Sequence, residues 1–282
     1  MTVARRLRHA GFLAAKGLYQ AAGPAGQGRL VLVPGVQRSG TNLAMNLLER
    51  SWQTAVFHEH DRRAFEGYVM RPVAEIQALK ARSRAQVFVL KALLESHRTT
   101  LLMEQLAGPA GPEAARALWL VRDYRDMVNS HLVSWPGFGE HLDKLVADPG
   151  SAGFRGLGMS AETREILAAH YRADDGVASH VALFWWLRNR LFFDQALERD
   201  ARVLVLGYEA LVSRPAETTK RLCAHLGLTY SARLHAMIHA RSVAKRRAPE
   251  ISAPVAALCQ AMLDRFQGSG IRHQGSNNKV LG

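Results

Sequence analysis

The sequence predicts a three-layer α/β fold, in which a parallel sheet of about five strands lies between two layers of helices. Short apolar runs of strand length alternate along the chain with longer stretches of helical periodicity. Such alternation is typical of parallel sheets whose strands are joined by helical crossovers. The 282 residues are 48% hydrophobic and 22% charged, which supplies a sizeable core and excludes a disordered chain.

The strands are predicted from five runs that are nearly continuous in apolar side chains, as expected of strands buried on both faces. These runs cover residues 30–33, 54–58, 86–91, 117–121 and 202–206. Helical patterns cover residues 73–82, 97–107, 124–134 and 178–197, and another with Leu43, Leu47 and Leu48 follows the first run. The glycine-rich and polar residues 136–160 are expected to form a lid or substrate loop, and residues 268–282 a mobile tail.

The first 28 residues differ in character from the rest of the chain. They carry the cations Arg5, Arg6, Arg8 and Lys16 among small apolar residues and end in a glycine-rich linker. Two interpretations are open: an amphipathic helix that lies on an anionic membrane surface, or a helix docked on the protein itself. We therefore divide the chain into a basic N-terminal helix with its linker, residues 1–28, and a main domain, residues 29–282.

Charge and cysteine content narrow the possible partners and the compartment. The net charge is +13, which suits an anionic partner such as a nucleotide, a nucleic acid, an acidic glycan or an anionic lipid. Cys223 and Cys259 form no CxxC motif, so neither a disulfide framework nor a cysteine-rich zinc site is expected. The reducing cytoplasm is the predicted compartment, with peripheral attachment to a membrane left open by the N-terminal segment.

A phosphate-binding loop is predicted between the first strand and the helix after it. The segment reads Gly35-x-x-x-x-Gly40-Thr41, and such loops turn their backbone N–H groups and a helix N-terminus toward phosphate oxygens. The nucleotide triphosphatase version has a lysine after the second glycine, where this chain has Thr41. The fixed charge sits earlier, at Arg38. We therefore expect a P-loop-like fold for a nucleotide that needs no metal ion.

The residues of this loop resemble a known family. Gln37, Arg38, Ser39, Gly40, Thr41 and Asn42 are similar to the 5′-phosphosulfate loop of sulfotransferases, commonly PRSGTT or PKSGTT. The chain departs from that pattern at Gln37 and Asn42, and both changes keep a small or polar loop. The resemblance implies that these six residues hold 3′-phosphoadenosine 5′-phosphosulfate (PAPS), the sulfuryl donor of the family.

Two later stretches extend the resemblance over about residues 30–230. A predicted strand ends at Arg122, and Ser130 follows eight residues later, about two turns into a helix. A guanidinium and a hydroxyl placed in this way can share one phosphate. The pattern is similar to the family's 3′-phosphate motif, which implies that Arg122 and Ser130 hold that phosphate. By the same resemblance, Tyr208 lies near the adenine.

The proton acceptor has more than one candidate. Sulfuryl transfer requires a base, and also cations near the leaving phosphate. Glu59 stands after the second strand, about where tyrosylprotein-type and several bacterial members place a glutamate. In a strand, His58 and His60 share the opposite face and are the alternatives. Lys91, at the end of the third strand, and Arg38 supply the predicted catalytic positive charge.

The sequence thus resembles a PAPS-dependent sulfotransferase that acts on a hydroxyl of a carbohydrate, a glycolipid or a small metabolite. A P-loop kinase or NTPase and a non-enzymatic module that binds nucleic acid or glycan are the alternatives. In the preferred interpretation no nucleic acid and no metal are expected, and the oligomeric state is not predicted. The basic residues 241–247 either fold over the nucleotide or form a solvated charge run.

Overall fold

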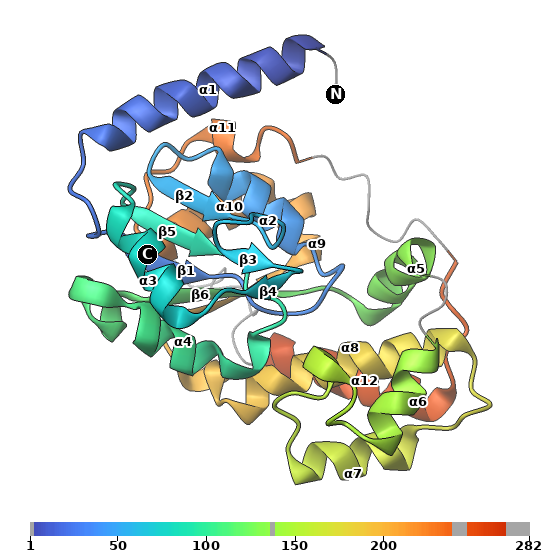
Figure 1. Cartoon of the computed structure of the whole chain (residues 1–282). Coiled ribbons are helices and arrows are strands. Elements are labelled where there is room, and N and C mark those ends of the chain that lie inside the picture. Colours follow the sequence, from blue (N-terminus) through green and yellow to red (C-terminus); the bar gives the residue numbers. More distant parts are fainter. Residues whose placement is uncertain (1–2, 136–138, 239–246, 269–282) are drawn as a thin grey trace, which may run out of the picture.

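The computed structural model describes residues 3–135, 139–238 and 247–268 (Figure 1). Its main sheet has five parallel strands in the order β2-β5-β1-β6-β7. They are β1 (Arg29–Leu32), β2 (Thr54–Phe57), β5 (Val87–Leu90), β6 (Arg116–Val121) and β7 (Val203–Gly207). Each strand lies within about a residue of its predicted range, so the α/β fold predicted from the sequence is confirmed.

The strand order determines where a ligand can bind. The chain leaves β1 toward β2 on one side of the sheet, and later crosses to β6 on the other side. In open α/β sheets a ligand cleft forms at such a switch point, outside the carboxyl ends of the strands. All four side chains of β5 are buried, in keeping with a strand that is covered by helices on both faces.

Helices cover both faces of the sheet. One face is covered by α2 (Thr41–Glu49), α9 (Tyr208–Ser213), α10 (Pro215–Leu226) and the short α11 (Ala232–His235). The other face is covered by α3 (Val73–Arg82), α4 (Thr99–Leu106) and α8 (Val177–Asp194). Around α8 pack α5 (Tyr124–Ser134), α6 (Gly139–Ala147), α7 (Ala161–His170) and α12 (Ala253–Phe266). In Figure 1, α6, α7, α8 and α12 form the lower part of the molecule, and α5 lies to the right.

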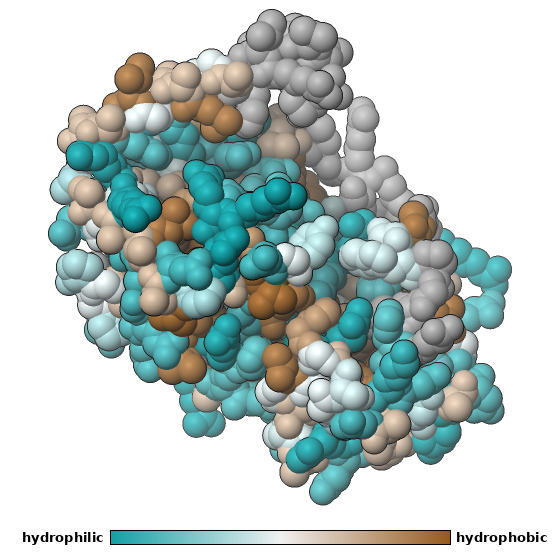
Figure 2. Space-filling model, in the orientation of Figure 1, coloured by the Kyte–Doolittle hydropathy of each residue, from teal (hydrophilic) through white to brown (hydrophobic). Residues whose placement is uncertain are grey.

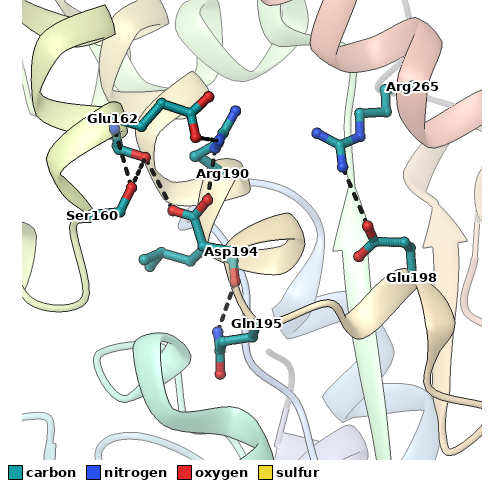
Figure 3. Close-up of polar contacts among 9 residues, drawn as sticks. Ser160, Glu162, Arg190, Asp194, Gln195, Glu198 and Arg265 are labelled. Carbon is teal, nitrogen blue, oxygen red and sulfur yellow. Dashed lines mark hydrogen bonds and ion pairs between the residues drawn. The ribbon is translucent and has the colours of Figure 1, made fainter.

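Ion pairs link α7 to α8, and α12 to the 3-10 turn (Leu197–Arg199) that follows α8 (Figure 3). Arg190 of α8 lies 2.7 Å from both Glu162 of α7 and Asp194 of its own helix. The Arg265 side chain of α12 lies 3.2 Å from Glu198. Beneath this surface, Trp185 and Phe192 of α8 are fully buried. The helical layer is therefore a packed body that can hold the segment between α6 and α7 in place.

Several elements differ from the sequence-based prediction. Part of residues 136–160 is helical: α6 forms because Leu142 and Leu145, three residues apart, bury against the α8 cluster. A 3-10 turn (Gly153–Arg155) follows it. The hairpin of β3 (Phe65–Glu66) and β4 (Val69–Met70) was not predicted, because two-residue strands carry no periodicity. Buried Glu95 supports it by accepting a hydrogen bond of 2.7 Å from the Met70 N–H.

The N-terminal helix α1 (Val3–Ala21) is docked on the protein. The Phe12 ring meets Trp52 edge-on at 5.0 Å. Lys16 is 6% exposed and donates a hydrogen bond of 2.7 Å to the Glu49 carbonyl, and burial lowers the Lys16 pKa to about 8. Lys16 is therefore engaged in this contact and is not available to bind an anionic membrane surface. The side chains of Arg5, Arg6 and Arg8 lie outside the described residues, as do 241–246 and 269–282.

In the part of the chain that the structure describes, every helix is too short or too polar to cross a bilayer.

Candidate active site

The carboxyl ends of all five strands open into one cavity of about 390 Å³. The phosphate loop follows β1, Glu59 follows β2, Lys91 follows β5, Arg122 follows β6 and Tyr208 follows β7. Parallel strands end at the same edge of a sheet, which is why residues distant in sequence meet here. Ser130 and Trp135, from α5 and the residue after it, complete one side of the cavity.

The phosphate loop is held in an unusual backbone conformation. Gly35 and Gly40 have φ of 125° and 95°, and Arg38 between them has φ of 66°, which is rare for a residue with a side chain. The Ser96 hydroxyl lies 2.8 Å from the Gly35 N–H, from which it accepts, and 3.2 Å from the Gly35 carbonyl. Backbone strain of this kind persists where the surroundings impose it, typically at ligand sites.

Several polar groups of the loop fit an anion such as a phosphate. Helix α2 starts beside the cavity, and no side chain caps its N-terminus, where N–H groups and the helix dipole favour negative charge. The Ser39 hydroxyl and the Gln37 amide oxygen are buried and have no hydrogen-bond partner among the described residues. A phosphate oxygen would satisfy the Ser39 hydroxyl, so these residues fit the 5′-end of a nucleotide.

The residues predicted to bind the two phosphates come together in this cavity. The Arg38 guanidinium donates a 3.0 Å hydrogen bond to the Ser130 hydroxyl. Arg122 donates a 3.2 Å hydrogen bond to the Arg38 carbonyl, and its guanidinium lies 4.4 Å from the centre of the Tyr208 ring. Two guanidinium groups and a hydroxyl thus gather in one cleft, an arrangement suited to phosphate.

Gly40→Ala should abolish tight nucleotide binding. A Cβ at Gly40 would lie 2.4 Å from the ring of Tyr208, which is 8% exposed, and φ at this position is left-handed. The loop or the ring must therefore move. We expect nucleotide affinity, measured by calorimetry, to fall by at least about 100-fold, since strain of 1–3 kcal/mol adds to the displaced contacts. Gly17→Ala in α1, where nothing lies within 4 Å, is the control and should bind normally.

Lys91 connects the phosphate loop to the predicted base. Its ammonium group donates a 2.6 Å hydrogen bond to the Asn42 amide oxygen and a 2.8 Å hydrogen bond to the Glu59 carboxylate. The Lys91 side chain is 3% exposed, whereas that of Glu59 is 25% exposed. Two partners hold the buried cation at the floor of the cavity, and the carboxylate stays accessible to a substrate. Asn42, one of the departures from the family pattern, thus fixes the Lys91 ammonium.

The two histidines next to Glu59 lie elsewhere. The rings of His58 and His60 stack at 5.4 Å, so they share one side of the chain although β2 already ends at Phe57. Burial lowers the pKa of His58. Neither ring lines the cavity at the strand ends, where Glu59 does. This placement favours Glu59 as the base over the two histidines.

A second cavity of about 780 Å³ adjoins the first, and Gln37, Glu59 and Trp135 line both. The remaining lining residues are Gly67, Tyr68, Val69, Leu94, His131, His141, Phe154, Arg155 and Phe184. None of these nine is among the site residues predicted from the sequence. His131 adjoins Ser130 and could have been noticed from that position, and Arg155 lies in the segment expected to be a substrate loop.

His131 should make the protein less stable in acid. It is 2% exposed, and its burial, with the nearby cations Arg38 and Arg155, lowers its pKa to about 4. Between pH 6.5 and 4 the imidazole of His131 binds a proton in the unfolded chain but stays neutral in the folded one. The free energy of unfolding therefore falls as the pH drops through this window. At pH 5 the free energy of unfolding is lower than at neutral pH by about 2 kcal/mol.

His131→Phe removes this group and keeps a ring beside Trp135 and Phe184. The free energy of unfolding from urea titrations at pH 7 and pH 5 should then change less in the variant than in the wild type. His60→Gln, at an exposed histidine, serves as the control and should keep the wild-type difference. An unchanged pH dependence in His131→Phe would contradict the assignment.

Among the described residues no group of three or more His, Cys, Asp or Glu side chains is placed to hold a metal ion.

The comparisons with known proteins agree with this geometry. The family model described as "Sulfotransferase domain" matches residues 29–279. No curated protein matches the chain. The structure is similar to the sulfotransferase domain of the Synechococcus olefin synthase, with a TM-score of 0.51, 12% identity, and coverage of 86% of this chain and 95% of that one. It is also similar to a sulfotransferase from Alicyclobacillus acidocaldarius, with a TM-score of 0.51, 15% identity, and coverage of 86% and 96%.

Proposed function

Because the chain belongs to the sulfotransferase domain family, we propose that it transfers the sulfuryl group of PAPS to a hydroxyl group of an acceptor molecule. The enzyme class follows from the family, and PAPS is the donor that the family uses. The kinase and the non-enzymatic binding module considered from the sequence are thereby set aside. The use of PAPS by this chain, the acceptor and the role of each residue are our proposal.

The main observation in support of the proposal is that Glu59 lines two adjoining cavities, one rich in cationic groups and one mostly apolar. The smaller cavity gathers Arg38, Arg122 and the phosphate loop, which suits a doubly phosphorylated nucleotide. The larger is lined mostly by apolar and aromatic side chains, which suits the body of an acceptor. A group that lines both can meet an acceptor hydroxyl at the point where the donor's sulfuryl group is presented.

In the proposed sulfuryl transfer, Glu59, Lys91 and Arg38 have different roles. PAPS supplies an activated sulfuryl group on its 5′-phosphate. The acceptor oxygen forms a bond to sulfur while the bond from sulfur to the phosphate oxygen breaks, and Glu59 takes the hydroxyl proton. Lys91 and Arg38 stabilise the negative charge that grows on the departing phosphate oxygen. The products are a sulfate ester and adenosine 3′,5′-bisphosphate.

Arg122→Ala tests the nucleotide assignment. Affinity for adenosine 3′,5′-bisphosphate should fall by roughly 10–100-fold, the equivalent of a lost charge-assisted hydrogen bond. Affinity for AMP, which lacks the 3′-phosphate, should change little. Calorimetry with both ligands on both proteins gives the comparison, and Ser130→Ala should show the same selectivity more weakly. A loss that is equal for the two nucleotides would argue against a 3′-phosphate site at Arg122.

The activity itself is tested by incubating the purified protein with PAPS and a mixture of hydroxylated acceptors, followed by mass spectrometry. A product heavier by one sulfuryl group, formed together with adenosine 3′,5′-bisphosphate, supports the proposal. Binding of ATP in place of the bisphosphate, with phosphate transfer dependent on a divalent metal, would overturn it.

A further inference from the structure

We propose that the second cavity receives an amphipathic hydroxy acid, whose anionic group pairs with Arg155 while its hydroxyl meets Glu59. This inference rests on the proposed function, because it names the acceptor of that reaction. It selects one class from the carbohydrates, glycolipids and small metabolites that the sequence leaves open.

The walls of the cavity favour an apolar body over a sugar chain. Its volume of about 780 Å³ is that of a small-molecule site. Trp135, Phe154 and Phe184 present aromatic side chains, and Leu94 and Val69 add aliphatic ones. A glycan exposes hydroxyls along its length, and these would lose water here without gaining many hydrogen-bond partners. A compact apolar molecule has few hydrogen bonds with water to lose when it enters the cavity.

The mouth of the cavity is also apolar. Tyr68, Val69 and Trp135 are 59%, 53% and 46% exposed, high values for side chains of this size. Figure 2 shows hydrophobic residues gathered on and below the β3–β4 hairpin, within a largely hydrophilic face. Apolar surface that gathers at a cavity entrance marks a binding site for apolar material.

Arg155 supplies a positive charge that the described protein does not balance. Its guanidinium contacts the Phe154 ring at 4.7 Å, and no described residue forms an ion pair or a side-chain hydrogen bond with it. Its Nε atom is buried without a partner. An arginine keeps its charge at neutral pH, so an anion in the cavity would relieve this cost of burial. Glu59 is the one carboxylate among the described lining residues, and it already pairs with Lys91.

The wall that carries Arg155 is built and fixed. Arg188 of α8 is fully buried and donates hydrogen bonds of 3.1 Å to the Phe154 carbonyl and 2.9 Å to the Leu93 carbonyl. One buried guanidinium thus joins the Gly153–Arg155 turn to the segment that provides Leu94. A preformed wall that carries a cation is suited to selecting one ligand chemistry.

Backbone strain marks another part of the cavity lining. Gly67 and Tyr68 form the two-residue turn of the β3–β4 hairpin, and both have positive φ, of 54° and 69°. This turn favours Asn-Gly or Gly-Gly, and a tyrosine in it costs stability. The tyrosine nevertheless stands at the cavity mouth, where a large ring can cover the apolar part of an acceptor. The hairpin is therefore strained at the position where contact with an acceptor is most useful.

The test uses acceptors that come in charged and neutral pairs. The acids are para-hydroxyphenylpropanoate, para-(hydroxymethyl)benzoate and omega-hydroxydodecanoate, each paired with its primary amide, and maltohexaose represents uncharged glycans. Sulfation by the full-length protein with PAPS is measured as kcat/KM. We expect at least one acid to exceed its amide by roughly 10-fold or more, as a charge-assisted contact gives. The glycan should be a poor acceptor.

Variants then assign the preference to Arg155. Arg155→Gln should bring the ratio of acid to amide close to one, and Arg155→Lys should retain part of it. Arg164→Gln, at an exposed arginine of α7 that lines neither cavity, is the matched control and should keep the wild-type ratio. Affinity for adenosine 3′,5′-bisphosphate should be the same in all four proteins, which shows that each variant is folded.

The outcomes separate this inference from the proposed function. Four results would contradict the proposed hydroxy-acid acceptor without contradicting the nucleotide site. They are equal kcat/KM for amides and acids, preferred sulfation of maltohexaose, no sulfation of any acid, and an acid preference that Arg155→Gln retains. Failure to bind adenosine 3′,5′-bisphosphate at all would instead overturn the proposed function.

Discussion

Glu59→Gln should lower kcat by roughly 10²–10⁴, the usual contribution of a general base. The amide keeps the size of the side chain and removes its capacity to take a proton. Because the proposed nucleotide contacts are made by the phosphate loop and Arg122 and not by Glu59, affinity for adenosine 3′,5′-bisphosphate should stay close to that of the wild type. Steady-state kinetics with one acceptor, together with calorimetry of the product nucleotide, measure both quantities.

His58→Asn and His60→Asn are the matched controls for this prediction. Each removes a titratable group one residue from Glu59, and neither histidine lines the cavity. Both variants should retain turnover within a few-fold of the wild type. If a histidine variant loses turnover while Glu59→Gln retains it, the imidazole and not the carboxylate is the base.

Lys91→Met should be similarly damaging, with a fall in kcat of about 10²–10³, as when a donor to developing negative charge is lost. Methionine resembles lysine in length and fits a buried site. Its introduction removes the cation from the departing phosphate and leaves the Asn42 oxygen and the Glu59 carboxylate without their shared donor.

Lys80→Met serves as the control for Lys91→Met, because Lys80 is also buried, donates a hydrogen bond to the Ala107 carbonyl, and lines neither cavity. It should lower stability, since a buried carbonyl loses its donor, and leave kcat unchanged. If both variants lose kcat in proportion to their loss of stability, Lys91 has only a structural role.

The parts of the site that follow from local geometry could be predicted from the sequence. Gly40 has a left-handed backbone, and Arg122 directly follows a buried strand, so both can be recognised from the order of residues. The carboxyl ends of parallel strands meet at one edge, which is why Glu59 and Lys91 could be assigned to one cleft from positions far apart in the chain. The bond between Lys91 and Asn42, in contrast, depends on side-chain direction and was not predicted.

The acceptor side could not be predicted in the same way, because tertiary contacts create it. The β3–β4 hairpin is too short to show alternation and is stabilised by a buried carboxylate from Glu95. The turn that holds Arg155 has the composition of an ordinary glycine-rich loop, and it is fixed by Arg188, 34 residues later than Phe154, which donates a hydrogen bond to the Phe154 carbonyl. His131 acquires its low pKa from burial and from cations on two other segments. None of these contacts is encoded by a local pattern.

The contact of Lys16 with the last residue of α2 has a consequence for how this protein is prepared. The family match begins at residue 29, so a shortened version starting there would be a natural choice for expression. The ammonium of Lys16 sits at the carboxyl end of the helix whose amino end adjoins the phosphate loop, and so compensates the negative pole of the helix dipole. Trimming the first 28 residues would remove that compensation and uncover Trp52, so the intact chain is the form in which to study the nucleotide site.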